Sequence, residues 1–488
     1  MLVRQSKNTF IRCYDNYGYI TNQMTYYDRT YNEIGADFLK SISRVPQDIE
    51  TIITDKLIPL YNGVTKLELE NDFINFIQDL ERNLFVVTGE TTNELDAKDL
   101  SFSYSLDNPK TMINDFTQIT DVEIKENTQT FFLERAQHKP QLIALQFELT
   151  SRCNERCIHC YIPNGKKDAG KDMPTKKVFE ILDQFAAMGG LHVTLSGGEV
   201  FMHKDILKII AYCREKDLKI TILSNLISLR ETQIPFIKAA NVSLIQVSLY
   251  SMDPKIHDTI TTIPNSFVRT KRAIEKLIEA DIPVQISCPI MKANKDGYKD
   301  VLAYAQDHKI KAQTDYIMMA QADFGTENLA NRISIAETER VIRDIIEYDI
   351  DYSKETLIST PISNNIRADL ERFSKQPICG VGQDNCCITE NGDVYPCAGW
   401  QAYVLGNIYE QSLSDIWNNS ERIKYLRNIK QSNFPKCLKC EARDYCAMCL
   451  VRNFNESGGD MFKINDHFCK VAFLNKRLVE EYKEKRLI

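Results

Sequence analysis

Phe147-Glu-Leu-Thr-Ser-Arg-Cys-Asn-Glu-Arg-Cys-Ile-His-Cys160 places three cysteines, Cys153, Cys157 and Cys160, on one short segment after an apolar run. Three thiolates can hold three of the four irons of a 4Fe-4S cluster, and the fourth iron is then open to a small molecule that receives an electron. A zinc knuckle with His159 as its fourth ligand is the competing interpretation. The segment therefore predicts either a reactive iron-sulfur centre or a structural zinc site.

Short apolar runs alternate with amphipathic helical patterns after this segment. The pattern between the first two runs has Val178, Ile181, Leu182 and Phe185 at helical spacing. Such alternation is typical of a parallel sheet with right-handed crossovers, in which ligands gather at the carboxyl ends of the strands. We expect six strands, at residues 142–150, 192–199, 219–225, 244–250, 283–290 and 311–319.

The CxxxCxxC spacing directly after the first expected strand resembles the radical S-adenosylmethionine (SAM) superfamily. The resemblance implies an α/β fold with a partial (β/α)6 barrel at residues 141–330. It also implies that the open iron binds SAM. One electron, from a flavodoxin- or ferredoxin-type donor, then cleaves SAM to methionine and a 5'-deoxyadenosyl radical.

A Gly-Gly-Glu motif closes the second expected strand. In the family the glycines let the backbone approach SAM and the glutamate accepts from its ammonium group, whereas a strand-ending turn is the alternative. Serines at the ends of the third and fifth strands, and the histidine before the last loop cysteine, resemble further SAM contacts. The implied SAM-binding residues are His159, Gly197, Gly198, Glu199, Ser224 and Ser287.

The cysteines of the C-terminal third are spaced as Cys379-x12-Gly392-x4-Cys397 and Cys437-x2-Cys440-x5-Cys446-x2-Cys449, with Cys469 beyond. This spacing resembles the SPASM domain, which carries two auxiliary 4Fe-4S clusters in radical SAM enzymes that modify peptides. The family usually has three residues between the last pair, where this chain has two. A zinc ribbon is the alternative. We expect the SPASM domain at residues 376–488, after a connecting helical segment at residues 331–375.

The resemblance also implies which cysteines hold each auxiliary cluster. Adjacent cysteines rarely ligate one cubane together, so one of the neighbours Cys386 and Cys387 is expected to be a ligand, and the sequence leaves open which one. One cluster would use Cys437, Cys440, Cys446 and Cys469, and the other would use Cys379, Cys397, Cys449 and either Cys386 or Cys387.

Cys288 lies in the fifth expected strand, near the expected mouth of the barrel. A thiol there could donate a hydrogen atom to a substrate radical, as peptide epimerases of the superfamily require. The alternative is a small residue of the hydrophobic core.

The first 95 residues predict three short strands followed by helices and a closing strand. This order resembles the small winged-helix domain called a RiPP recognition element, similar to the chaperone of pyrroloquinoline quinone biosynthesis. RiPPs are ribosomally made, post-translationally modified peptides. In such domains the leader of a precursor peptide adds a strand to an exposed sheet edge. Residues 96–140 are polar and predict a linker.

The charge of the chain bears on its partners. The net charge is -7, and residues 1–88 have nine Lys or Arg against twelve Asp or Glu, a net 9 - 12 = -3. This disfavours nucleic acid, which needs a basic surface, and permits a basic leader. With 43% hydrophobic residues, no apolar run of about eighteen residues and no signal peptide, we expect a cytoplasmic protein without a membrane partner.

The sequence as a whole predicts an enzyme that modifies a ribosomally made precursor peptide, with SAM and three 4Fe-4S clusters as cofactors. The expected product is a thioether or another crosslink. Epimerisation of the peptide and the oxidation performed by anaerobic sulfatase-maturating enzymes are alternatives. A redox-sensing DNA-binding regulator is an alternative of another class. The peptide, the bond that forms and the oligomeric state are not determined by the sequence.

Overall fold

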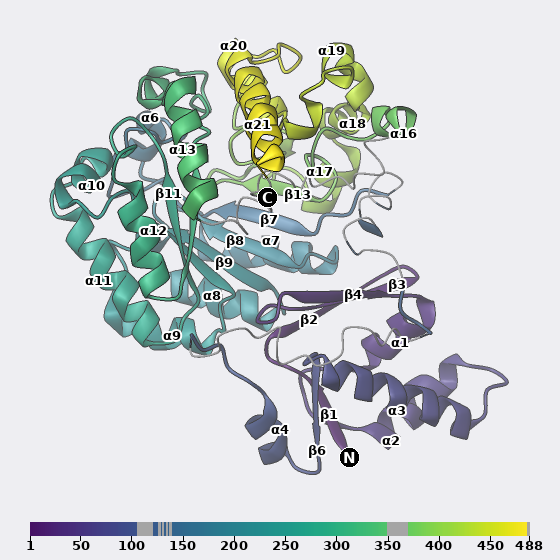
Figure 1. The fold of residues 1–488 in the computed structure, drawn as a ribbon. Helices are drawn as coiled ribbons and strands as arrows, with labels where there is room; N and C mark the ends of the chain where they lie inside the picture. The colour runs from purple at the N-terminus through teal and green to yellow at the C-terminus, as the bar shows by residue number, and fades with distance from the viewer. Residues whose placement is uncertain are drawn as a thin grey trace.

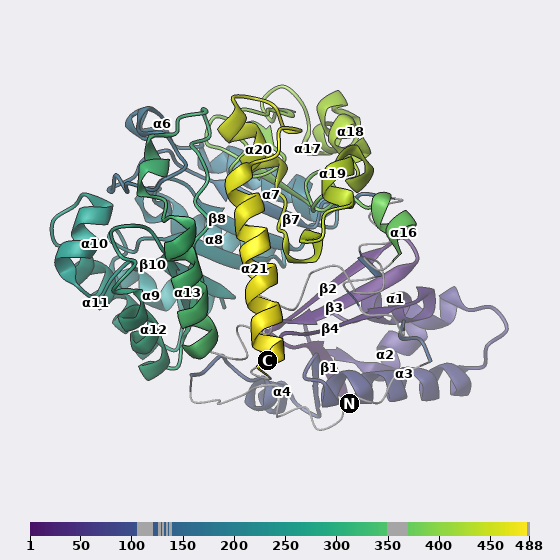
Figure 2. The same cartoon turned by 45° about the horizontal axis from the view of Figure 1, so that its top comes forward.

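The computed structural model describes residues 1–104, 121–124, 128, 131–132, 135, 139–348 and 369–485. An N-terminal region, purple in Figure 1, lies below a central sheet, and the green to yellow C-terminal region lies above it. A view turned by 45° keeps these three regions distinct (Figure 2). The central sheet is therefore bordered by a small region on each side.

The N-terminal region contains two small sheets. One has the antiparallel order β2-β3-β4, with β2 (Thr9–Tyr14), β3 (Tyr17–Asn22) and β4 (Tyr27–Tyr31). In the other, β1 (Leu2–Gln5) lies between β5 (Gln47–Asp48) and β6 (Val86–Gly89). The sequence predicts β2, β3 and β6, but it places the third strand at residues 24–27, ahead of β4, and it does not predict that β1 and β5 pair into a second sheet.

Helices pack beside these sheets. Helix α3 begins at Thr65, whose side chain accepts from the Glu68 amide while the Glu68 carboxylate accepts from the Thr65 amide, a capping box. Phe38 packs edge-on against Phe73 and Phe76 in the core of the region. The helices of this region are α1 (Glu33–Ser41), α2 (Ile49–Ile52), η1 (Ile53–Leu57), η2 (Ile58–Leu60), α3 (Lys66–Arg82) and α4 (Thr92–Lys98).

The N-terminal region is docked on the amino ends of the central strands. Arg12 and Arg44 both pair with Asp217, just before β9 (Lys219–Ser224). The Arg12 guanidinium also donates to the Gly190 carbonyl over 2.8 Å, just before β8 (His192–Ser196). This region therefore lies at the end of the barrel opposite the carboxyl ends of the strands.

Six neighbouring strands of the central sheet are parallel and follow the order β12-β11-β10-β9-β8-β7. The partial barrel predicted from the sequence is confirmed, with all six strands inside the expected ranges. Besides β8 and β9, the strands are β7 (Ala144–Glu148), β10 (Leu244–Ser248), β11 (Val284–Pro289) and β12 (Lys311–Asp315).

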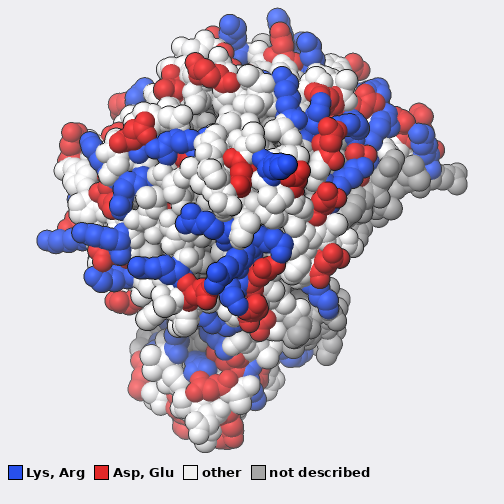
Figure 3. Space-filling model, turned by 90° about the vertical axis from the view of Figure 1, so that its left-hand side faces the viewer, with Lys and Arg blue, Asp and Glu red and all other residues white. Residues whose placement is uncertain are grey.

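Helices follow the strands. The helices are α6 (Asn164–Asp168), α7 (Thr175–Ala187), α8 (Ile206–Glu215), α9 (Ile234–Ala239), α10 (Pro254–Thr261), α11 (Ser266–Glu279) and α12 (Tyr298–Asp307). Of these, α7, α8, α9, α11 and α12 pack their buried side chains on one face of the sheet. Short turns of 3-10 helix are η4 (Val200–Met202), η5 (Glu231–Gln233) and η6 (Glu327–Asn331). On the face in Figure 3, basic and acidic side chains are intermixed.

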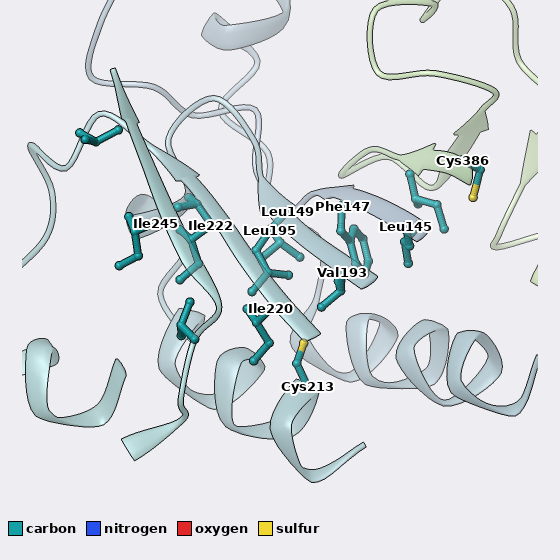
Figure 4. Close-up of a cluster of buried hydrophobic side chains, with 14 of the residues drawn as sticks. Leu145, Phe147, Leu149, Val193, Leu195, Cys213, Ile220, Ile222, Ile245 and Cys386 are labelled. Atoms are coloured by element: carbon teal, nitrogen blue, oxygen red, sulfur yellow. The ribbon is translucent and has the colours of Figure 1, made fainter. Parts of the chain in front are cut away.

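The two faces of the barrel strands differ in chemistry. Alternate residues such as Phe147, Leu195 and Ile222 are buried against the helices, with Cys213 of α8 among them (Figure 4). The residues between them face the lumen and are half-buried and polar, as in Gln146, Thr194, Gln246, Gln285 and Ser287. The barrel thus presents an apolar face to the helices and a polar lumen to a substrate.

The C-terminal region extends the same sheet. Strand β13 (Asn385–Ile388) pairs in parallel with β7, and β14 (Asp393–Tyr395) and β15 (Gly406–Asn407) continue in antiparallel pairing. A nine-stranded sheet results. The sequence predicts a separate domain here, so the shared sheet is a feature that it does not reveal.

The remaining helices surround this extension. Helix α13 (Ile335–Tyr348) packs beside α21 (Asp466–Glu484), and Arg343 pairs with Glu481 at 2.6 Å. The others are α16 (Leu370–Ser374), α17 (Leu413–Asn419), α18 (Glu421–Asn428), η8 (Gln431–Asn433), α19 (Pro435–Leu438), η9 (Arg443–Tyr445) and α20 (Leu450–Ser457). In the described residues, no helix combines the length and the apolar character that crossing a membrane requires.

Candidate active site

The loop after β7 carries Cys153, Cys157 and Cys160 around one buried ammonium group. Lys167 on α6 is 3% exposed. Burial lowers the pKa of Lys167, but the neighbouring thiols of Cys160, Cys153 and Cys157 raise it above its usual value. The three thiols therefore lie around the same point, as the ligands of one cluster would. Lys167 is a site residue that sequence reasoning missed, because nothing in its local pattern distinguishes it from a surface lysine.

Burial disfavours ionisation of two of the loop thiols, those of Cys153 and Cys157. It raises the pKa of Cys153 to about 11 and that of Cys157 well above its usual value. The Cys157 thiol donates to the Glu155 carboxylate over 3.2 Å. A metal must be bound by the thiolate form, so metal binding at this loop must displace protons. The donor set fits an iron-sulfur cluster: three thiols, no disulfide and a neighbouring cation.

The glycines of the Gly-Gly-Glu motif lie against the loop that carries these cysteines. The Gly198 amide donates to the Thr150 carbonyl and the Glu199 amide to the Arg152 carbonyl, both over 2.7 Å. A Cβ on Gly197 would lie 2.5 Å from the Thr150 carbonyl oxygen, and one on Gly198 would lie 2.4 Å from that of Arg152. Only glycine permits this approach. We call the loop that carries Cys153, Cys157 and Cys160 the cluster loop. The motif therefore holds the cluster loop against the end of β8.

Glu199 is buried and held by three hydrogen bonds. Its carboxylate accepts from the Ser224 hydroxyl over 2.7 Å, from the Asn225 amide over 2.8 Å and from the Phe201 amide over 3.0 Å. Burial raises the pKa of Glu199 in spite of these bonds. The arrangement places an acceptor and Ser224 together at the adjoining ends of β8 and β9.

His159 and Ser287 lie on two other sides of the barrel end. The His159 ring is buried edge-on against Tyr250, with centroids 5.0 Å apart, and burial lowers its pKa to about 4. A neutral imidazole in this position is compatible with contact to an aromatic base. Ser287 is half-buried in the lumen and pairs with Ser248 of β10. Both roles in SAM binding stay predictions.

Cys288 lies on the face of β11 opposite Ser287. Its side chain is fully buried in the hydrophobic core, and burial raises its pKa to about 12. The thiol lies 3.7 Å from the Tyr250 carbonyl oxygen. This is the position of a core residue, which is the alternative that the sequence left open. The role of hydrogen-atom donor stays a prediction, and it requires the thiol to reach the lumen.

A buried polar network joins the cluster loop to the C-terminal region. Glu148, at the end of β7, accepts from the Tyr161 hydroxyl over 2.8 Å and from the Gln401 amide over 2.9 Å. Lys166 in turn donates to the Gln401 carbonyl oxygen over 2.9 Å. Burial raises the pKa of Glu148 to about 7. Sequence reasoning missed this network, because Gln401 reaches Glu148 only once the two regions share a sheet.

Four cysteines of the C-terminal region approach one another near this network. Cys379, an exposed side chain, has the thiols of Cys449 and Cys397 as neighbours. Cys387 likewise has Cys397 among its neighbours. Cys386 points to the other face of β13 and packs in the hydrophobic core beside Leu145 (Figure 4). The structure thus brings Cys387 toward the other thiols and Cys386 away from them.

The second group consists of Cys437, Cys440, Cys446 and Cys469. Cys437 has the thiols of Cys469 and Cys440 as neighbours, and Cys446 has the thiols of all three others as neighbours. Among the described residues, no three His, Cys, Asp or Glu side chains are close enough to hold a single metal ion. A cubane binds one thiolate at each of four irons, so its ligands stand farther apart than those of one ion.

Two family models match the chain. Residues 147–319 match the radical SAM superfamily, and residues 379–441 match an iron-sulfur cluster-binding domain, SPASM. The chain carries a radical SAM domain followed by a SPASM domain, and it is an enzyme. The first match contains all three loop cysteines and the Gly-Gly-Glu motif, and the second contains Cys379, Cys386, Cys387, Cys397, Cys437 and Cys440.

Two curated relatives and one solved structure illustrate the similarity of this radical SAM enzyme to known proteins. An AdoMet-dependent heme synthase of Methanosarcina barkeri is 27% identical over 334 residues, which are 65% of this chain and 93% of the relative. The subtilosin biosynthesis protein AlbA of Bacillus subtilis is 25% identical over 346 residues, 70% of this chain and 74% of AlbA. Streptococcus suis SuiB bound to precursor peptide SuiA has a TM-score of 0.59 at 17% identity, with 95% of this chain and 99% of SuiB covered. At that identity, the likeness to SuiB shows the fold alone.

Proposed function

We propose that this radical SAM enzyme modifies a ribosomally made precursor peptide in the cytoplasm and that it forms a thioether or another crosslink. The observation that carries the proposal is the extent of the fold. The solved structure of SuiB bound to precursor peptide SuiA corresponds to 95% of this chain, N-terminal region included. The match to the heme synthase covers 93% of that relative but only 65% of this chain. The part of the chain beyond the heme synthase match is best explained by a peptide substrate.

The proposed site is assembled from the residues described above. Cys153, Cys157 and Cys160 would hold the SAM-binding cluster beside Lys167, whose positive charge offsets that of the thiolates. Glu199, fixed by Ser224 and two amides, would orient the ammonium group of SAM. When bound, the clusters and SAM supply single electrons and the radical that removes a hydrogen atom from the peptide.

The ligands of the auxiliary clusters follow from the two cysteine groups. We assign one cluster to Cys437, Cys440, Cys446 and Cys469. We assign the other to Cys379, Cys387, Cys397 and Cys449, with Cys386 left in the core. A fully ligated cluster beside the barrel favours electron transfer over direct binding of a substrate thiolate. A flavodoxin- or ferredoxin-type protein would be the external electron donor.

The lumen explains how a peptide could be held while it reacts. Its half-buried amides and hydroxyls, such as those of Gln146, Gln246 and Ser287, can bond to an extended backbone without selecting one side chain. Closing the lumen with the substrate excludes water from the reacting carbon. Selection of the peptide would then depend on the N-terminal region, which lies at the other end of the barrel and recognises a leader rather than the residues that react.

The test is anaerobic reconstitution with iron and sulfide, followed by dithionite and SAM, with 5'-deoxyadenosine as the product measured. We expect it from the wild type and from Cys213→Ala, a core thiol, and not from Cys157→Ala. Incubation with the peptide encoded by a neighbouring short reading frame should then give a product lighter by two hydrogens. An unchanged peptide together with conversion of an iron tetrapyrrole would overturn the proposal.

A further inference from the structure

The outer edge of β4 is covered by a short piece of the chain's own segment 121–124. The Asn32 amide donates to the Val122 carbonyl and the Ile124 amide donates to the Thr30 carbonyl, both over 2.9 Å. Tyr31 and Glu123 form an antiparallel bridge between them. We call Val122, Glu123 and Ile124 the edge segment. It makes the backbone bonds that an added peptide strand would make.

The edge segment also inserts a carboxylate beside a buried arginine. Glu123 Oε1 lies 3.3 Å from Arg29 Nε. The Arg29 side chain is 1% exposed and pairs with Asp79 of α3 at 2.5 Å on its other side. Removing one partner from a buried ion network is strongly unfavourable. Whatever lies on the β4 edge must therefore offer a carboxylate at this point.

Apolar contacts complete the fit of the edge segment. Val122 packs against the core formed by the N-terminal strands and helices, and Ile124 packs against a cluster that includes Phe10, Tyr14 and Tyr19. The segment thus places an acidic side chain between two apolar ones, with the backbone extended along β4. This is the chemistry of a bound peptide ligand rather than of a solvated linker.

We infer that the β4 edge is a site for an extended peptide with an acidic residue flanked by apolar ones, and that the edge segment occupies this site until such a peptide displaces it. The inference rests on the proposed function, because it takes the peptide to be the leader of the precursor. The N-terminal region as a whole carries a net negative charge, but the position beside Arg29 favours an acidic side chain of the bound peptide.

Competition by the edge segment would control when a leader binds. A tethered segment competes at an effective concentration that reaches millimolar for short flexible connections. A leader must therefore supply the carboxylate and the apolar contacts at least as well as the edge segment does. Its apparent affinity falls in proportion to the fraction of sites that the edge segment leaves free. Competition by the edge segment would therefore exclude peptides that offer only backbone hydrogen bonds to β4.

The experiment uses full-length protein and one synthetic peptide. Ile124→Pro removes the amide that bonds to Thr30 and opens the edge, and Asp121→Ala, at an exposed neighbouring residue, is the control. The probe is a fluorescein-labelled peptide with the sequence of residues 118–127, Gln-Ile-Thr-Asp-Val-Glu-Ile-Lys-Glu-Asn, followed by anisotropy. We expect at least about tenfold tighter binding to Ile124→Pro than to the wild type or the control.

A second peptide tests the acidic residue. Changing the glutamate that corresponds to Glu123 to glutamine should weaken binding to the opened protein about tenfold, as expected for loss of a charge-assisted bond. Equal binding to all three proteins, no binding to Ile124→Pro, or equal binding of both peptides would overturn the inference. If Ile124→Pro does not fold, Glu123→Gln replaces it, because that variant keeps the backbone bonds and removes the pairing with Arg29.

The outcome is independent of the proposed reaction. Peptide binding requires neither SAM nor reduction, whereas 5'-deoxyadenosine formation requires both. Protein that cleaves SAM but fails to bind the peptide when opened contradicts the inference alone. Protein that binds the peptide when opened but never cleaves SAM contradicts the proposed function alone.

Discussion

Gln401 Nε2 lies 2.9 Å from Glu148 Oε2, although 253 residues separate them in the chain. The bond joins the end of the first barrel strand to the loop after β14. Tyr161, directly after the last loop cysteine, binds the other oxygen of the same carboxylate. Glu148 therefore connects the loop that carries Cys153, Cys157 and Cys160 with the neighbourhood of Cys387.

The protonation of Glu148 should make stability depend on pH. Burial raises its pKa from 4.5 to about 7, so the stabilisation of the neutral acid is fully present below about pH 4.5 and is lost as pH rises through about 7. We expect the free energy of unfolding of the wild type to fall, relative to Glu148→Gln, by up to about 3 kcal/mol between pH 5 and pH 8. Urea unfolding of the loaded protein measures this. Glu371→Gln, at an exposed residue, should keep the wild-type slope; identical slopes for Glu148→Gln and the wild type would contradict the prediction.

The neighbours Cys386 and Cys387 should respond differently to substitution. Cys387→Ser should lose one auxiliary cluster, about four of roughly twelve irons per chain, because its thiol lies among the other ligands. Cys386→Ser should keep its iron and lose about 1–3 kcal/mol of stability, because a hydroxyl replaces a thiol in the core. Iron analysis and Mössbauer spectra separate the two. Full iron in Cys387→Ser would show that the assignment is wrong.

Gly198 should not tolerate a side chain. A Cβ there would lie 2.4 Å from the Arg152 carbonyl, which is backbone and cannot move without displacing the cluster loop. We expect Gly198→Ala to lose more than about 2 kcal/mol and most of the SAM-binding cluster. Gly165→Ala is the matched control, because its added Cβ would meet nothing within 4 Å. Iron retention and unfolding curves measure both. Wild-type iron content in Gly198→Ala would argue against the role given to the motif.

Asp217 should hold the N-terminal region on the barrel. Both Arg12 and Arg44 pair with it, and Asp217→Asn removes the charge while keeping the shape. Leaving two partly buried guanidinium groups without their acid should cost about 1–3 kcal/mol and loosen the region. Hydrogen exchange of β2 and β3 should accelerate, while exchange in β9 changes little. Asp183→Asn, within a surface pair with Lys216, provides the control. Unchanged exchange in β2 would refute this role.

The sequence predicts the barrel well because its signal is local. All the barrel strands except β12 contain a run of alternating or continuous apolar residues, and the loop cysteines follow the first strand directly. The clusters of the C-terminal region are likewise marked by spacing. The carboxyl ends of parallel strands meet at one edge of the sheet. This rule alone predicts that the expected cofactor-binding residues lie close together.

What the sequence does not predict depends on long-range pairing. Strand β13 has four residues and no periodic pattern, so its pairing with β7 cannot be read locally. The choice between Cys386 and Cys387 follows from which face of β13 each occupies, and that face is defined only by the pairing. Lys167 resembles any lysine of a polar helix, and its burial is imposed by the loop packed over it.

The barrel and the C-terminal region share one sheet, and this affects how the chain folds while the ribosome synthesises it. Ala144 of β7 and its partner Asn385 are 241 residues apart. At about 5–20 residues per second, a ribosome needs roughly 12–50 s to deliver the second strand after the first. Throughout that interval one edge of β7 lacks its native neighbour, and nascent chains on the same message could join through it. Slow translation of the second half of the message should therefore make folding of this protein depend more on chaperones that shield strand edges. The same should hold for any fragment of the chain that stops before residue 385.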